Sequence, residues 1–212
     1  MAIRFIASGE SRSFPEGTDA LPADDDGIVV TGTAAGSALP SADDAAQAAF
    51  VAVELGTECL ALHTGLEPDR GNLRTVGFAR FRMGDAAPTA LIEIVRQPWT
   101  EPDAVTAARA FFEAAGFKTA VCEDVPGRIV DRLIRPYLNA VLRRLDDKLA
   151  SAQDMDTTLR LGLGYPIGPN ALLAATGLAH HYDVTQALYE ALGDRDFAPA
   201  RAAQVAKARA GE

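Results

Sequence analysis

The sequence predicts an α/β domain followed by an all-α domain. Short apolar runs alternate with helical segments up to about residue 123, which is typical of a sheet whose strands are joined by helices. After that point the apolar residues recur at intervals of three and four, as they do in amphipathic helices. We therefore expect two domains, residues 1–123 and residues 124–212.

Strands of the first domain are predicted where four to eight mostly apolar residues are bounded by Gly, Pro, Ser or Asp. Ser41 and the acidic residues after it predict a helix that continues to Leu55 and ends at Gly56. Thr100-Glu101-Pro102-Asp103 resembles a capping box and predicts a second helix, over 102–115. The predicted strands are residues 3–7, 27–32, 59–63, 75–82, 89–96 and 118–123.

The second domain is predicted to start with a long helix, residues 126–149, that has a wide apolar face. Pro126 and Gly127 stand at its expected start, and Pro136 lies inside it, where a missing N–H should bend the helix. Ser151 predicts the N-cap of the next helix and Gly164 its end. This helix is predicted at about 153–162, and further helices are predicted at about 169–176, 179–192 and 198–208.

Two motifs in the second domain resemble a known family. They are Pro126-Gly127-Arg128-Ile129-Val130-Asp131-Arg132 and Gly162-Leu163-Gly164-Tyr165-Pro166-Ile167-Gly168-Pro169. The order and spacing of these pieces, from about Asp124 to Pro199, are similar to the C-terminal helical domain of 3-hydroxyacyl-CoA dehydrogenases, where the motifs run P-G-F-I-V-N-R and G-x-G-Y-P-x-G-P. The resemblance implies a Rossmann-like first domain and a second domain of the 3-hydroxyacyl-CoA and 6-phosphogluconate dehydrogenase C-terminal type.

The first domain departs from what the resemblance implies. A Rossmann domain carries G-x-G-x-x-G after its first strand, whereas this chain has one glycine, Gly9, in the stretch from Ile6 to Arg12. The glycines of Gly32-Thr33-Ala34-Ala35-Gly36 have the wrong spacing. Fewer than 75 residues precede Thr75, so at least one β-α-β unit is expected to be missing. We therefore expect a shortened, degenerate Rossmann-like domain that binds no cofactor.

The catalytic pair that the resemblance implies is also incomplete. The family uses a His as base and a Glu about twelve residues later to orient it. Here Ala79 stands at the His position, and Glu93 matches the Glu. The family's active-site Asn is Asp131, which cannot donate a hydrogen bond when ionised. Glu93 and Asp131 are therefore the remaining candidate catalytic residues.

Other candidate residues have ordinary alternatives. Cys59 and His63 are four apart in a predicted strand and would share a face, as a nucleophile–base pair or as two plain strand residues. His180, His181 and Asp183 could suggest a metal, but adjacent helical residues point in different directions, so we predict surface or interface residues and no metal site.

Three arginines of the long helix, Arg128, Arg132 and Arg135, form a basic stripe in the sequence. A solvated helix face is the default interpretation of such a stripe. It could alternatively hold a CoA phosphate or a partner's carboxylates.

Composition excludes some classes of partner. The formal net charge is −9, which disfavours polyanions such as nucleic acid and anionic membranes. No apolar run reaches the roughly 18 residues of a membrane span, and the stretch from Met1 to Ala7 is too short for a signal sequence, so a cytoplasmic location is expected. Cys59 and Cys122 lie in apolar runs and are expected to be free thiols.

These observations favour a degenerate relative of the 3-hydroxyacyl-CoA dehydrogenases. It would be catalytically impaired and act as a dimerising or acyl-CoA-handling subunit, either as a homodimer through its C-terminal helices or in a hetero-oligomer with an acyl-CoA enzyme. An acyl-CoA ligand is possible on this hypothesis. The alternative is an active oxidoreductase on a 3-hydroxyacyl-CoA or related thioester, which would bind NAD through unusual contacts.

Overall fold

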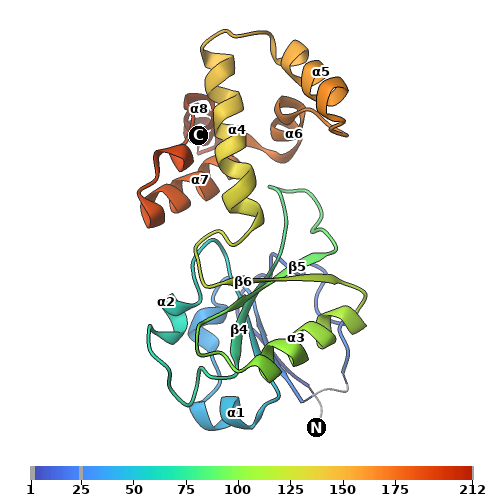
Figure 1. The fold of residues 1–212 in the computed structure, drawn as a ribbon, viewed down its shortest axis with the longest axis vertical. Coiled ribbons are helices and arrows are strands. Elements are labelled where there is room, and N and C mark those ends of the chain that lie inside the picture. Colours follow the sequence, from blue (N-terminus) through green and yellow to red (C-terminus); the bar gives the residue numbers. More distant parts are fainter. Residues whose placement is uncertain (1–2, 24–25, 212) are drawn as a thin grey trace. The chain divides into compact units, whose positions relative to one another are not determined.

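The computed structural model describes residues 3–23 and 26–211, so Met1 and Ala2, at the expected start of the chain's first strand, lie outside the described residues. The chain forms two compact units, shown in Figure 1. The sheet unit comprises Met1–Arg82 and Ala87–Ile129, and the helical unit comprises Met83–Ala86 and Val130–Glu212.

The sheet unit contains a six-stranded sheet whose spatial order is the order along the chain. The first four strands are parallel, β5 is antiparallel to β4, and β6 is parallel to β5. The strands are β1 (Arg4–Ala7), β2 (Ile28–Thr31), β3 (Val51–Glu54), β4 (Thr75–Arg80), β5 (Leu91–Arg96) and β6 (Lys118–Glu123).

Each face of the sheet has its own apolar core. One face packs against α3 (Pro102–Ala114) through Phe111 and Phe112, and against Phe14 and Leu21 of the segment that joins β1 to β2. The other face is covered by small residues, including Ala35 and Ala45, from short elements between the strands. These elements are the 3-10 helix η1 (Ala35–Ala38) and the helices α1 (Ala42–Gln47) and α2 (Ala61–Thr64).

Two predicted elements of this unit are wrong. The helix predicted up to Leu55 ends at Gln47, because Val51–Glu54 is a fully buried central strand. A short continuous apolar run fits either a helix or a strand buried on both faces. Residues 59–63 were predicted as a strand but lead into α2, whose first amides donate to Asp124.

The capping box predicted at Thr100 is absent from α3. The helix is capped by Glu101, whose side chain makes no capping hydrogen bond. Thr100 Oγ1 instead accepts from the backbone N–H of Gln97 at 3.0 Å and lies 3.4 Å from the carbonyl oxygen of Thr75. A buried hydroxyl that finds partners in the loop is not free to cap the helix.

The helical unit consists of the helices that the sequence predicts. Ser151 Oγ accepts from Asp154 N at the start of α5, and Gly164 ends that helix in a left-handed conformation, both as expected. The elements are α4 (Val130–Asp146), α5 (Ala152–Leu163), α6 (Pro169–Thr176), α7 (Leu178–Leu192), η2 (Arg195–Phe197) and α8 (Arg201–Ala210). None of the helices among residues 3–23 and 26–211 has the length and apolarity required to cross a bilayer.

The long helix is shorter than predicted, and its buried face is only partly apolar. It begins at Val130, because Gly127 and Arg128 have φ values of 78° and 49° that a helix cannot include. Polar residues share its buried side with apolar ones, while Leu133 is 73% exposed. The buried residues of α4 are Asp131, Arg135, Leu138, Asn139, Val141 and Leu142.

The helical unit also includes residues that precede it by more than forty positions. Residues Met83–Ala86, between β4 and β5, belong to this unit. A Cβ atom on Gly84 would overlap the carbonyl oxygen of Thr176, so the two backbones are in close contact there. Asp85 Oδ1 lies 3.1 Å from His180 Nε2. A tight turn of the β4–β5 connection is therefore part of the packing of the helical unit.

Candidate functional site

The position of the expected catalytic pair lies on two neighbouring strands of the sheet unit. Ala79 on β4 and Glu93 on β5 are paired residues of the antiparallel ladder. Directly opposed residues project their side chains to the same face, with Cβ atoms about 5 Å apart. The alignment of Ala79 with the family's His is therefore consistent with the geometry, because a His at position 79 would stand beside Glu93.

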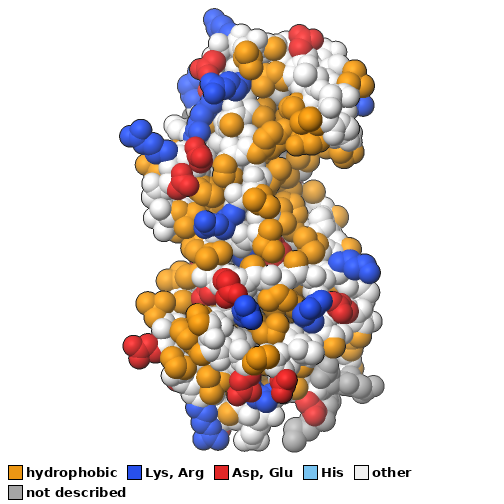
Figure 2. Space-filling model, in the orientation of Figure 1, with side chains coloured by type: hydrophobic (Ala, Val, Ile, Leu, Met, Phe, Trp, Pro, Cys, Tyr) orange, Lys and Arg blue, Asp and Glu red, His pale blue; other side chains and the backbone are white. Residues whose placement is uncertain are grey.

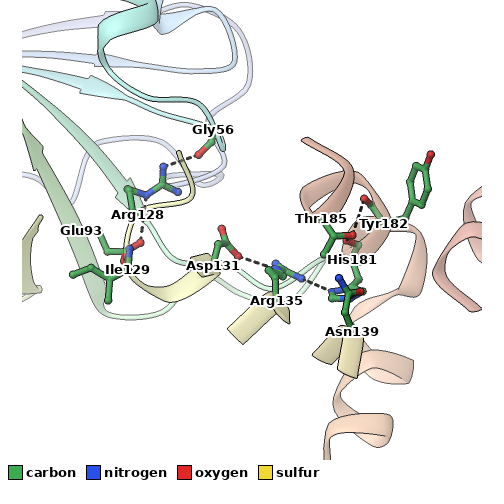
Figure 3. A network of polar contacts seen from close by, with 10 residues as sticks. All are labelled: Gly56, Glu93, Arg128, Ile129, Asp131, Arg135, Asn139, His181, Tyr182 and Thr185. Atoms are coloured by element: carbon green, nitrogen blue, oxygen red, sulfur yellow. Dashed lines mark hydrogen bonds and ion pairs between the residues drawn. The ribbon is translucent and has the colours of Figure 1, made fainter. Parts of the chain in front are cut away.

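Glu93 has other partners in this chain. Its Oε1 accepts the backbone N–H of Ile129 at 2.9 Å, and its Oε2 lies 3.3 Å from Arg128 Nε. Both charged side chains are buried, with 1% of Glu93 and 6% of Arg128 exposed. Figure 3 shows Arg128 continuing to the carbonyl oxygen of Gly56, at 2.7 Å. A buried carboxylate with these partners is a structural anchor for residues 128–129.

The guanidinium of Arg128 joins the two strands that flank β4. Gly56 follows β3, and Glu93 belongs to β5, while Ala79 lies on the strand between them. The small side chain of Ala79 leaves room over β4 for this bridge. Sequence analysis missed this role because it placed Arg128 on a solvated helix face. In the structure Arg128 and Arg135 are both buried, and only Arg132 of the three is exposed.

Asp131 belongs to a separate polar network inside the helical unit. Its Oδ1 accepts from Arg135 Nε at 2.7 Å, and Arg135 Nη1 lies 3.2 Å from His181 Nδ1. A guanidinium can only donate, so His181 Nδ1 is the acceptor and its Nε2 carries the proton. That N–H donates to Asn139 Oδ1 at 3.0 Å (Figure 3). The carboxylate of Asp131 is therefore committed to a structural ion pair.

Burial and the adjacent Arg135 lower the pKa of His181 from its usual value near 6.5 to about 3. His180 and His181 were predicted as surface or interface residues; His181 is 1% exposed and lies against Arg135 and Asn139 of α4. His180 is half-buried and pairs with Asp85, while Asp183 pairs with Lys207. Within the described ranges, no three His, Cys, Asp or Glu side chains converge on a potential metal site.

A small cleft lies at the carboxyl ends of the first strands of the sheet unit. Its volume is about 160 Å³, and it is lined by backbone after β2 and β3 and by Glu10, Arg12, Glu58 and His63. His63 Nε2 lies 3.4 Å from Glu58 Oε1. Neither alternative for Cys59 and His63, a nucleophile–base pair or two plain strand residues, arises on a strand face, because this segment leads into a helical turn.

Glu54 is a polar residue of this cleft that sequence analysis missed, because it lay inside a predicted helix. It ends β3 and is 6% exposed. Its Oε1 accepts from Ser13 N and its Oε2 from Gly32 N, each at 2.7 Å. Gly32 follows β2 with a φ of 108°, and a Cβ there would overlap the backbone of Ser8. The two loops and the carboxylate therefore form one closely packed cluster.

These residues do not fit a nicotinamide dinucleotide. Dinucleotides bind at the point where the strand order of a doubly wound sheet reverses, and the order β1 to β6 has no reversal. The cleft of about 160 Å³ is smaller than the roughly 300–1,000 Å³ of typical ligand sites. In addition, Glu54 places a negative charge against the amides that an anionic group would need.

Comparisons with known proteins give the same family for the helical unit. Residues 127–211 match the family model "3-hydroxyacyl-CoA dehydrogenase, C-terminal domain". The human mitochondrial hydroxyacyl-coenzyme A dehydrogenase is 40% identical over 88 residues, which cover 42% of this chain and 28% of the human protein. A 3-hydroxybutyryl-CoA dehydrogenase of Bradyrhizobium diazoefficiens is 30% identical over 109 residues, 51% of this chain and 37% of that protein. These matches thus span well under half of each relative.

Solved structures are similar in fold to both units of this chain, including the sheet unit. The 3-hydroxybutyryl-CoA dehydrogenase of Escherichia coli has a TM-score of 0.71 at 24% identity, covering 85% of this chain and 39% of that one. The (S)-3-hydroxybutyryl-CoA dehydrogenase PaaH1 of Ralstonia eutropha has a TM-score of 0.69 at 22% identity, covering 87% and 66%. The fold is a Rossmann-like sheet unit followed by a helical unit, and residues 127–211 of the helical unit match the C-terminal domain of 3-hydroxyacyl-CoA dehydrogenases.

Proposed function

We propose that this chain is a 3-hydroxyacyl-CoA dehydrogenase-like protein that is impaired in dehydrogenation and acts as a dimerising or acyl-CoA-handling subunit. The observation that carries the proposal is the pair Ala79 and Glu93. Ala79 stands where the family has its base, and its methyl side chain cannot accept a proton. Glu93, which would orient a base, is instead bonded to Arg128 and to the backbone N–H of Ile129. Removing a positioned general base lowers a rate by about 10²–10⁴.

The first test is direct measurement of cofactor binding and turnover. Titration with NADH, followed by calorimetry and by the fluorescence of Trp99, the only tryptophan, should show no binding in the low micromolar range. Reduction of acetoacetyl-CoA by NADH should be absent or weak. Robust turnover would instead support an active oxidoreductase that uses Glu93 or Asp131.

A substitution series separates loss of the base from loss of the cofactor site. Ala79→His alone should restore no activity, because Arg128 still holds Glu93 and the dinucleotide site is absent. Ala79→His combined with Arg128→Phe frees the carboxylate and restores the aromatic residue of the family motif. This double variant should still fail to bind NADH. Binding by either variant would show that the cofactor site is intact.

The proposed assembly is a homodimer through the helical unit. Helix α5 has twelve residues and buries none of its side chains. It packs against α6, where Asp156 accepts from the backbone N–H groups of Asn170 and Ala171, and this contact leaves much of its apolar surface in solvent. Leu161 is 81% exposed, Leu163 63% and Leu133 73%. Figure 2 shows hydrophobic side chains gathered over this part of the helical unit. A second copy, related by a two-fold axis, would cover them.

This interface is narrower than the sequence predicts. Leu138, Val141 and Leu142 of α4, and Leu173 and Leu188 of the later helices, are already buried within the unit. The unsatisfied apolar surface is therefore concentrated on α5 and on the turn after it, where Tyr165 and Ile167 are also exposed.

Sedimentation at micromolar concentration should give a dimer, and Leu161→Lys should shift it toward monomer. Leu66→Lys is a matched control, because Leu66 is equally exposed, at 81%, but lies in the sheet unit. A well-folded monomer of 22.3 kDa at those concentrations would contradict the homodimer. Dimerisation that Leu66→Lys disrupts instead would move the interface to the sheet unit.

A further inference from the structure

We propose that Glu54 is a built-in anion that occupies, from within the chain, the oxyanion site at the carboxyl ends of β2 and β3. The proposal deepens the proposed function, on which it rests, because it names the residue that keeps anionic ligands out of the cleft. The ligand class that this site would take without Glu54 is a small oxyanion such as phosphate.

A count of the backbone amides around the cleft supports the proposal. The N–H groups of Thr33, Ala34 and Ala35 donate to the carbonyl oxygens of Glu10, Ser8 and Gly32. Ser8 N donates to Thr31 O at 2.7 Å. Backbone hydrogen bonds therefore satisfy these donors, while Gly56 N donates to Oε1 of Glu58 at 2.9 Å.

The amides of Gly32 and Ser13 differ, because both donate to the carboxylate of Glu54, at 2.7 Å each. Two amides that converge on the two oxygens of one anion have the geometry by which backbone N–H groups hold phosphate and carboxylate ligands. The two amides belong to the loops that follow β1 and β2, and the carboxylate that they bind belongs to Glu54 at the end of β3.

The charge balance of the cleft shows why an external anion cannot share it. Glu10 and Glu58 line the cleft together with Glu54, and Arg12 is the one arginine among its lining residues, so an anionic ligand would meet three carboxylates against one guanidinium. Glu54 is nearly inaccessible to solvent, and a second buried anion beside it would be strongly disfavoured. Removal of Glu54 leaves two amides without an acceptor, and an unsatisfied buried donor favours any small acceptor that fits.

The test is a titration of Glu54→Ala with inorganic phosphate at constant ionic strength, followed by thermal unfolding. Phosphate should stabilise Glu54→Ala in a saturable way, and at ten times its Kd the folded-to-unfolded ratio should rise about elevenfold. The wild type should show no such response. In an amide NMR spectrum of Glu54→Ala, phosphate should shift the Gly32 and Ser13 resonances.

Two variants control for charge. Glu10→Ala removes the same charge from the same cleft, but the Glu10 side chain holds neither amide, so it should gain no phosphate response. Glu54→Asp keeps an anion at the site and should also gain none. Equal responses from Glu10→Ala and Glu54→Ala would overturn the proposal, as would no response from Glu54→Ala.

Where Glu54→Ala does not fold without phosphate, its refolding yield becomes the measurement. Phosphate should raise that yield, whereas chloride at equal ionic strength should not, and a yield independent of phosphate would overturn the proposal. NADH binding by the wild type tests the proposed function separately. Failure of the Glu54 proposal can therefore be distinguished from failure of the proposed function.

Discussion

The sheet unit and the helical unit each bury one carboxylate against one arginine, and they do so in different ways. Glu93 and Arg128 are 35 residues apart, and their pairing fixes the segment before α4 to β5. Asp131 and Arg135 are one helical turn apart, and their pairing continues into His181 and Asn139. The first pair holds residues 128–129 against β5, whereas the second belongs to a hydrogen-bond network within the core of the helical unit.

The number of hydrogen bonds that each carboxylate accepts follows from this difference. Glu93 uses both oxygens, one for a backbone amide and one for the guanidinium. Asp131 accepts from Arg135 through Oδ1. Replacement of a carboxylate by an amide preserves one acceptor oxygen and turns the other into a donor. The same chemical change should therefore have unequal effects at the two sites.

The largest effect is expected for Glu93→Gln. The amide cannot accept from both Ile129 N and Arg128 Nε, and the charge of Arg128 is left buried without its counterion. Loss of one partner of a buried ion pair costs about 3–5 kcal/mol in the free energy of unfolding. Urea denaturation measures it. A double variant, Glu93→Met with Arg128→Met, should recover much of the loss, and a loss below about 1 kcal/mol for Glu93→Gln would show that Glu93 is not an anchor.

A pH effect on stability is expected from His181 of the helical unit. His181 has a pKa of about 3 in the folded chain and an ordinary value near 6.5 when unfolded. Because the unfolded state binds the proton more readily between these values, stability is complete above about pH 6.5 and is lost as the pH falls. Between pH 7 and pH 5 the loss should be about 2 kcal/mol.

His181→Gln should remove that part of the pH dependence, even where it lowers stability at pH 7. His180→Gln is the matched control, because this neighbour on the same helix is half-buried and makes its contact with Asp85 instead. A pH dependence that survives in His181→Gln would assign the titration to other groups.

The smallest effect is expected for Asp131→Asn. The amide oxygen still accepts from Arg135 Nε, and Arg135 keeps its contact with His181. Arg135 also loses its buried counterion, but it keeps both of these contacts, so the cost in the free energy of unfolding should be about 2 kcal/mol, below that of Glu93→Gln. Urea denaturation of Asp131→Asn and Glu93→Gln under the same conditions compares the two losses of unfolding free energy. A cost equal to that of Glu93→Gln would mean that both carboxylates anchor their units to the same extent.

The order of elements was largely predictable from sequence, because most strands and helices have clear periods and end signals. Two elements are exceptions: residues 59–63, which lead into α2, and β3, whose valines and alanine form a continuous apolar run after an Ala-rich helix. Periodicity cannot distinguish such a central parallel strand from a buried helix. That one error hid Glu54, because a helical glutamate would be expected in solvent.

The sequence motifs single out candidate residues but do not predict the contacts that these residues make. A comparison of motifs identifies Ala79, Glu93 and Asp131. It does not show that Arg128 has left the helix, because that depends on two successive left-handed residues, only one of which is a glycine. The contact between Glu93 and Arg128, which are 35 residues apart, depends on the path of the chain, and local sequence patterns do not predict that path.

The turn between β4 and β5 affects how this protein can be divided. Residues 83–86 are connected on both sides to the sheet unit in sequence, yet they pack with Thr176 and His180 of the helical unit. The chain therefore passes between units at three places, after Arg82, Ala86 and Ile129. A single cut before Val130 would release helices that lack a part of their own packing. Transfer of the helical unit to another protein requires the loop as well, so recombination at one boundary would separate residues that depend on each other.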